Sequence, residues 1–127
     1  MQTYPYEIDY FTTESGKKPF KEWLDGLKDV TGRAKIRVRI DRVRLGNLGD
    51  NRTVGEGVRE LRIDYGPGYR AYFGIDGDRL VLLLLGGDKS SQEKDIAKSK
   101  EYWRDHQRRS THDQNRNFIP EGSDRSP

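Results

Sequence analysis

The 127-residue sequence has no cysteine and only two histidines. Without cysteine the chain cannot form a disulfide scaffold or a thiolate zinc site, and this composition suits a reducing cytosol, so we expect a cytoplasmic protein. The histidines, His106 and His112, fall at the end of the last predicted helix and in the C-terminal tail. We therefore expect no His-based triad, metal site or histidine-pair ribonuclease, and no cofactor, since no cluster of acids suggests a carboxylate metal site.

Long hydrophobic runs are also missing. The longest, residues 80–85, has six residues, and the N-terminus MQTYPYEIDYF has no basic region followed by a long apolar stretch. We expect neither a signal peptide nor a membrane span. Only 31% of the residues are hydrophobic and 35% are charged, which suggests that part of the chain buries little. Residues 110–127 contain two prolines and few large apolar residues, so we predict one domain, 1–109, and a disordered tail, 110–127.

Two patterns near the N-terminus predict a strand followed by a helix. Residues 4–11, YPYEIDYF, are rich in aromatic side chains and alternate roughly, which is typical of a strand beginning near Pro5. After the turn TTESGKK, Pro19 suits the first position of a helix. The apolar residues that follow have the spacing of one buried helical face: Phe20, Trp23, Leu24 and Leu27.

Residues 31–48, TGRAKIRVRIDRVRLGNL, fit two patterns. RAKIRVRI alternates like a strand, but Ile36, Ile40 and Val43 also form a helical stripe. The stretch exceeds the usual strand length of ~3 to 10 residues, so we predict a helix with Thr31 near its N-cap. Its basic residues either solvate an amphipathic helix or hold an anionic partner. They are Arg33, Lys35, Arg37, Arg39, Arg42 and Arg44.

The remaining elements complete a small mixed domain. The glycine-rich segment 46–57, GNLGDNRTVGEG, is predicted to be a loop, and three strands follow it: VRELRID, YRAYFGI and LVLLLL. The third is apolar on both faces and should be covered on both sides. Ser90 and Glu93 have the spacing of a capping box, so we expect a last helix from there to about Arg109. The order β-α-α-β-β-β-α predicts an α+β fold with one curved antiparallel sheet carrying helices.

Strand alternation bears on the charge within YGPGYRAYF, residues 65–73. Alternate residues of this strand suit the core: Tyr69, Ala71 and Phe73. Arg70 and Tyr72 then point to the opposite face. A tyrosine on that face can stack on a nucleobase or simply pack against its neighbours.

Two further cations are expected near Arg70. Arg62 lies on the preceding strand and faces the side of the sheet opposite to Leu61 and Ile63. Lys89 follows the next strand, beside a helix N-terminus that favours anions. The three cations form either a phosphate cradle or cross-strand ion pairs with acids such as Glu60 and Asp64. Spacing alone favours the ion pairs.

Two strings, GVRELRIDYGPGYRAYF and LVLLLLGGDKSSQEKDIAKSKEYW, closely resemble the RelE/ParE superfamily of toxins from bacterial toxin–antitoxin modules. Within it, the sequence is most similar to the phage-derived, HigB-like "addiction module killer" branch. The resemblance covers roughly residues 4–105 and rests on the combination of ELR, GxGYR and LLxGGDKSSQxxDI. It implies a RelE-like fold and a type II toxin that enters the ribosome and cuts mRNA. A helix-turn-helix antitoxin, HigA-like, would neutralise the toxin and link it to operator DNA.

The resemblance also assigns roles to residues. Arg70 matches the arginine of a YR motif that contacts the scissile phosphate, and Lys89 matches a basic residue after the third strand. Arg62 approximately matches a basic residue of the preceding strand. These three are the expected catalytic residues. Three others are expected to bind substrate: Arg59, Tyr72 and Gln92.

The implied chemistry is metal-independent attack of a ribose 2′-hydroxyl on the adjacent phosphorus. Arg62 and Arg70 suit charge stabilisation because guanidinium groups stay protonated, whereas a desolvated Lys89 can take part in proton transfer. The segment SSQEKD lacks the tyrosine or histidine that family ribonucleases often carry there. This absence leaves open an inactive antitoxin-binding remnant. A separate alternative is a ParE-like toxin that poisons a topoisomerase, although such toxins lack the full cation cluster that Arg62, Arg70 and Lys89 largely keep.

Overall fold

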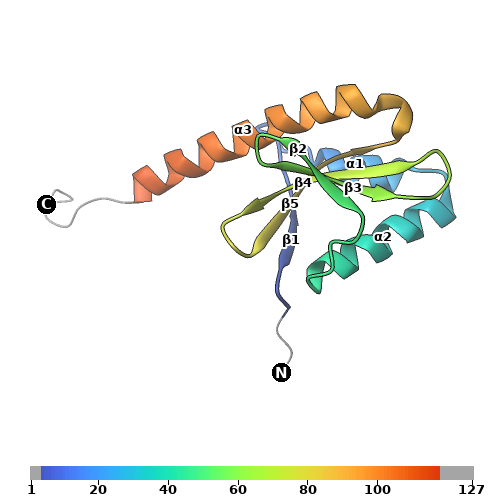
Figure 1. Ribbon diagram of the computed structural model, residues 1–127. Helices are drawn as coiled ribbons and strands as arrows, with labels where there is room; N and C mark the ends of the chain where they lie inside the picture. Colours follow the sequence, from blue (N-terminus) through green and yellow to red (C-terminus); the bar gives the residue numbers. More distant parts are fainter. Residues whose placement is uncertain (1–3, 118–127) are drawn as a thin grey trace, which may run out of the picture.

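The computed structural model describes residues 4–117, with side chains as far as Ser110. Its elements are β1 (Glu7–Tyr10), α1 (Pro19–Gly26), α2 (Val30–Arg44), β2 (Asn51–Gly55), β3 (Val58–Ile63), β4 (Tyr69–Asp76), β5 (Leu80–Gly87), the short 3₁₀ helix η1 (Lys89–Ser91) and α3 (Gln92–Asn117). The strands form one five-stranded sheet in the order β1-β5-β4-β3-β2 (Figure 1). The predicted α+β class is confirmed.

The sheet separates two hydrophobic cores. Helices α1 and α2 cover one face, where their apolar stripes, including Phe20, Leu24 and Ile36, pack on alternate residues of β3, β4 and β5. Helix α3 covers the other face, with Trp103 in its core (Figure 1). Strand β5 contributes to both cores, as its apolar faces predicted. The predicted core residues of β4 all lie on the α1 and α2 face: Tyr69, Ala71 and Phe73.

Both edges of the sheet differ from the expectation. Strand β2 forms inside the segment predicted to be a loop and pairs antiparallel with β3. Its sequence NRTVG is largely polar because it is an exposed edge, so it lacks the alternation that marks a half-buried strand. Strand β1 is parallel to β5, so the sheet is not wholly antiparallel.

Aspartates cap α2 and η1. The carboxylate of Asp29, the N-cap of α2, accepts hydrogen bonds from the Gly32 N–H at 2.9 Å and from the Tyr69 hydroxyl at 2.8 Å. These bonds, the backbone one first, hold the pKa of Asp29 below its usual value. The α2 N-cap is therefore two residues before the predicted Thr31.

The C-terminal helix begins and ends differently from the prediction. The expected capping box at Ser90 is replaced by Asp88, whose carboxylate accepts from the Ser90 N–H at 2.8 Å and starts η1. Helix α3 continues to Asn117, so the predicted end near residue 109 is wrong. The rest of the predicted tail, 118–127, lies outside the described residues, and the division at residue 109 stays a prediction. No helix in the described part of the chain is long and apolar enough to cross a membrane.

Candidate active site

Three predicted catalytic cations line one hollow of about 510 Å³ beside the β3–β4 turn. Arg62 of β3 and Arg70 of β4 are directly opposite each other in the strand register, and Lys89 begins η1 just after β5. Two carboxylates, Asp50 and Asp64, line the same hollow. The structure thus brings the three cations together, while their catalytic roles stay predictions.

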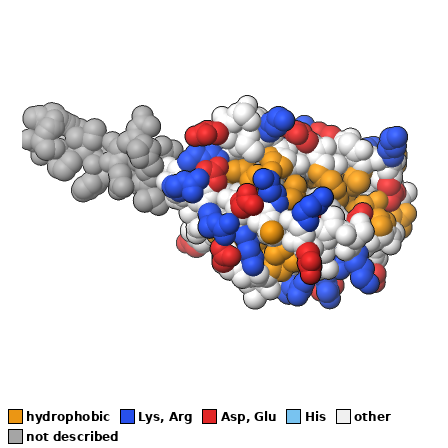
Figure 2. Space-filling model, turned by 90° about the horizontal axis from the view of Figure 1, so that it is seen from above, with side chains coloured by type: hydrophobic (Ala, Val, Ile, Leu, Met, Phe, Trp, Pro, Cys, Tyr) orange, Lys and Arg blue, Asp and Glu red, His pale blue; other side chains and the backbone are white. Residues whose placement is uncertain are grey.

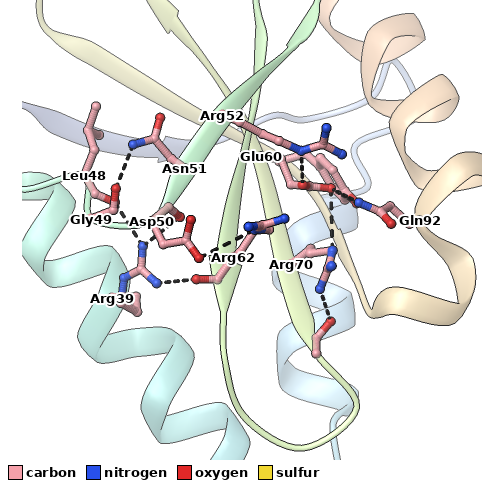
Figure 3. Close-up of polar contacts among 12 residues, drawn as sticks. Arg39, Leu48, Gly49, Asp50, Asn51, Arg52, Glu60, Arg62, Arg70 and Gln92 are labelled. Atoms are coloured by element: carbon pink, nitrogen blue, oxygen red, sulfur yellow. Dashed lines mark hydrogen bonds and ion pairs between the residues drawn. The ribbon is translucent and has the colours of Figure 1, made fainter.

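Arg70 is a buried and oriented side chain. Only 10% of it is exposed, and its Nη1 donates a hydrogen bond to the Gly68 carbonyl oxygen at 2.7 Å. Its Nε lies 3.6 Å from Glu60 Oε2, an ion pair without a hydrogen bond (Figure 3). Gly68 has φ of 80°, and a Cβ there would lie 3.1 Å from Arg70 Nη1, so a glycine is needed beside this guanidinium.

Glu60 is the buried carboxylate of the site. It is fully enclosed, and its Oε1 accepts from Arg52 Nε at 2.8 Å. Its Oε2 accepts from the Tyr72 hydroxyl at 3.0 Å and from Gln92 Nε2 at 2.8 Å. Burial alone would raise the pKa of Glu60, but hydrogen bonds from Arg52, Gln92 and Tyr72 outweigh it and lower the pKa. The carboxylate is therefore charged at neutral pH.

The sequence left two readings of the three cations open, a phosphate cradle and cross-strand ion pairs, and the structure is compatible with both. Arg70 does pair with Glu60, yet it also lines the hollow beside the other two cations. Arg62 pairs instead with Asp50, with 3.5 Å between Nε and Oδ2. The buried pair holds Arg70 in place, whereas the exposed Arg62–Asp50 pair is weak, and both arginine side chains stay in the wall of the hollow.

Arg39 ties the start of β2 to the end of β3 from α2. Its guanidinium donates to the Arg62 carbonyl oxygen, to Leu48 O at 2.9 Å and to Asp50 O at 3.3 Å (Figure 3). Burial disfavours the charged guanidinium and so lowers the pKa of Arg39. Its hydrogen bonds to backbone oxygens offset this desolvation cost. This arginine of the basic helix therefore supports the backbone that carries Arg62.

The predicted substrate-binding residues do not line the hollow. Tyr72 is fully buried under α3, and the Gln92 side-chain amide donates its hydrogen bond to Glu60. Burial, and then Glu60, raises the pKa of Tyr72, so its hydroxyl remains a donor. Arg59 faces the opposite side of the sheet from Arg62, because side chains alternate along β3, and it donates to Asn51 Oδ1 at 2.9 Å.

Lys89 is exposed at the rim of the hollow. Its backbone N–H faces the Pro67 carbonyl oxygen at 3.4 Å, so η1 meets the β3–β4 turn there. The expected desolvation of its amine is therefore not seen. Its place at the end of the third predicted strand agrees with the sequence prediction.

A second buried carboxylate, Asp95, lies against Gly87, next to the strand position of Arg70. It accepts from Ser91 Oγ at 2.5 Å, and a Cβ on Gly87 would lie only 1.9 Å from its Oδ2. Gly87 is the direct partner of Arg70 across β4 and β5. Burial raises the pKa of Asp95. Of the glycine pair at the end of β5, which the sequence motif contains, Gly87 thus makes room for the first turn of α3, whereas Gly86 makes room for Trp23 of α1.

Charges of both signs are mixed on the α3 side of the molecule. Figure 2 shows Lys and Arg side chains interspersed with Asp and Glu around exposed apolar groups. Ion pairs of α3 residues include Arg104 with Glu56 at 2.6 Å and Arg108 with Asp105 at 2.8 Å. This surface is not dominated by one sign, in contrast to the group of cations at the hollow.

Comparison with known proteins identifies a family for this chain. A family described as "Phage derived protein Gp49-like (DUF891)" matches residues 22–103, a range that contains the hollow. The protein is a member of the HigB/RelE-like toxin superfamily of toxin–antitoxin systems. Within it, the chain belongs to the Gp49-like family. A Haemophilus influenzae protein, itself described as uncharacterized, is 51% identical over 81 residues, 64% of this chain and 82% of the relative.

Proposed function

We propose that this protein is the toxin of a type II toxin–antitoxin module and cleaves mRNA on the ribosome. One observation carries the proposal: cations from β3, β4 and η1 surround a single hollow, and the central one, Arg70, is buried and oriented. The planar guanidinium fork matches two oxygens of one phosphate, so an RNA backbone is the ligand that this set suits best. Membership of the toxin superfamily supports the same conclusion.

The proposed reaction is attack of a ribose 2′-hydroxyl on the adjacent phosphorus, with the 5′-oxygen as leaving group. Arg70 stabilises the charge that develops on the phosphoryl oxygens, and Arg62 and Lys89 approach from the sides. The proton acceptor and donor come from groups that the hollow contains: the carboxylates of Asp50 and Asp64 and the amine of Lys89. The ribosome would supply the in-line alignment of the mRNA, which such a small site needs.

The proposal includes two further partners in the cytoplasm. A helix-turn-helix antitoxin of the HigA type neutralises the toxin, and the complex, through the antitoxin, binds operator DNA. The toxin would fall in the HigB-like addiction-module branch. Sequence similarity of the chain to that branch is what supports these partners.

Primer extension on mRNA in a purified translation system tests the activity. We expect new 5′ ends within the coding region only when ribosomes are present. Arg70→Ala should abolish them and leave antitoxin binding intact, although the loss of the buried partner of Glu60 should lower the urea unfolding midpoint. Undiminished cleavage by the folded Arg70→Ala variant would remove Arg70 from the mechanism.

The same preparations separate the alternatives. Intact mRNA together with inhibited DNA supercoiling would indicate a ParE-like topoisomerase poison. Antitoxin binding with neither effect would indicate an inactive remnant.

A further inference from the structure

A fully buried carboxylate next to the site needs a physical explanation. Desolvating a charged group costs several kcal/mol, and proteins tolerate this when the charge is paired and hydrogen-bonded. Glu60 is enclosed completely and receives donors from three elements: Arg52 of β2, Tyr72 of β4 and Gln92 of α3. Its fourth neighbour is Arg70.

The geometry divides the Arg70 guanidinium into a held side and a free side. A guanidinium has five N–H groups. The Nε–H side faces Glu60 at 3.6 Å and one Nη1–H is bound by Gly68 O, so three N–H groups remain on a side chain that lines the hollow (Figure 3). Rotation of the guanidinium would turn these groups away from a bound phosphate.

The hold on Nε is electrostatic. Glu60 Oε2 already accepts two hydrogen bonds, from Tyr72 and Gln92, and Arg70 Nε is buried without a hydrogen-bond partner. Gln92 therefore competes with Arg70 for this oxygen. The contact also links the orientation of Arg70 to the first residue of α3.

We propose that Glu60 is a positioning residue, whose buried charge fixes the Arg70 guanidinium so that its free N–H groups face the hollow. Its effect on catalysis rests on the proposed function, because only there does Arg70 meet a scissile phosphate. The orientation itself does not depend on any activity. The two parts can therefore be tested separately.

The first experiment measures the Arg70 side chain directly. In protein labelled with ¹⁵N-arginine, the Arg70 Nε–H signal is assigned by its loss in Arg70→Lys, and its exchange with solvent is followed by NMR. Glu60→Gln should speed this exchange about 10-fold or more. Asp76→Asn, which removes the charge from the 2.7 Å Asp76–His106 contact at another part of the α3 interface, is the matched control and should leave the exchange unchanged. Unchanged exchange in Glu60→Gln overturns the proposal.

Gln92→Ala gives a second test if Glu60→Gln fails to fold. Removing the competing amide frees an acceptor site on Oε2, so Arg70 Nε can move into a hydrogen bond and its exchange should slow. Slower exchange supports the proposal, and unchanged exchange overturns it.

The second experiment measures cleavage under single-turnover conditions with ribosome–mRNA complexes. Glu60→Gln should lower the maximal cleavage rate by about 100-fold, the scale expected for a misplaced catalytic group, without weakening half-saturation. A loss confined to half-saturation would contradict positioning. If the wild type does not cleave, the proposed function fails, whereas the exchange result still decides the role of Glu60.

Discussion

The two arginines that face each other across β3 and β4 have very different surroundings. The side chain of Arg70 is 10% exposed and its partner Glu60 is 0% exposed, whereas the values for Arg62 and its partner Asp50 are 43% and 57%. The site therefore has a buried half and an exposed half. Each half contains one arginine–carboxylate ion pair, and the two pairs act differently.

Burial decides what each half can contribute. Charges interact more strongly away from water, so Glu60 can fix Arg70 in one orientation before any ligand arrives. An exposed ion pair such as Arg62–Asp50 is worth only about 0–1 kcal/mol and is screened by salt. We infer that the buried half supplies preorganisation, while the exposed half supplies adjustable attraction for a polyanion.

The largest difference should appear when each arginine is replaced by lysine, which keeps the charge and removes the planar fork. Arg70→Lys should lower the single-turnover cleavage rate by about 100-fold or more, because a preorganised bidentate contact is lost. Arg62→Lys should cost less than about 10-fold, since an exposed charge needs less exact geometry. Equal losses in the two variants would contradict the division into halves.

Gly87→Ala should damage the buried half through the fold. The new methyl group would lie 1.9 Å from Asp95 Oδ2, so Asp95 and the first turn of α3 must shift. We expect a loss of about 1–3 kcal/mol in the free energy of unfolding, measured with urea, as for other overpacked sites. Gly26→Ala is the control, because nothing lies within 4 Å of its Cβ position, and it should be neutral or stabilising. Full stability of Gly87→Ala would show that Asp95 is not confined there.

The sequence predicted the parts of this fold that depend on local patterns. A strand period of two was enough to direct Arg70 away from the α1 and α2 core, and helical spacing was enough to find the buried stripe of α1. Strand β2 was missed because a polar edge strand buries too little to leave a pattern. The parallel pairing of β1 was missed because it joins distant parts of the chain.

The candidate site shows the same division. Arg62, Arg70 and Lys89 were placed together correctly, because neighbouring strands bring them to one end of the sheet. Tyr72 and Gln92 lie outside the hollow, which the sequence could not show, since only the packing of α3 reveals that both donate to Glu60. Glu60, which accepts from both, could not be recognised from sequence spacing either, because Gln92 reaches it only through the packing of α3.

Arg59 also lies outside the hollow, but for a different reason. The alternation that placed Leu61 and Ile63 in the core also assigns Arg59 to their face, so the signal was present. Its expected role in substrate binding does not follow from that pattern and stays a prediction. A strand's own alternation should therefore be applied to every charged residue it contains.

The pH dependence of stability should distinguish the two buried carboxylates. The folded pKa of Glu60 is lowered, so its stabilisation is present above the unfolded value of about 4.3 and is lost as pH falls through the folded pKa. The folded pKa of Asp95 is raised, so the fold loses stability as pH rises from the unfolded value of about 3.9 through the folded pKa.

Urea unfolding between about pH 3 and pH 7 measures both effects. Glu60→Gln should flatten the acid side of the stability curve. Asp95→Asn should gain stability relative to the wild type as pH rises, because the amide stays neutral. Parallel curves for the wild type and both variants would show that neither carboxylate has a shifted pKa.

The smallest effect is expected from Asp50→Asn, in the exposed half. Loss of the Arg62 partner should change the free energy of unfolding by less than about 1 kcal/mol. Removing a negative charge from the hollow should tighten binding of a short single-stranded RNA about 2- to 5-fold at low salt, and the gain should vanish near 1 M salt, where the Debye length is only about 3 Å.

Asp41→Asn is the matched control for this variant. Asp41 is also an exposed acid, 67% exposed and 2.8 Å from its partner Arg44, but it lies on α2 outside the hollow. It should leave RNA binding at low salt nearly unchanged. Equal tightening in both variants would mean that net charge, rather than the position of Asp50 beside Arg62, controls attraction. A loss of maximal cleavage in Asp50→Asn alone, with tighter binding, would instead identify Asp50 as the proton acceptor.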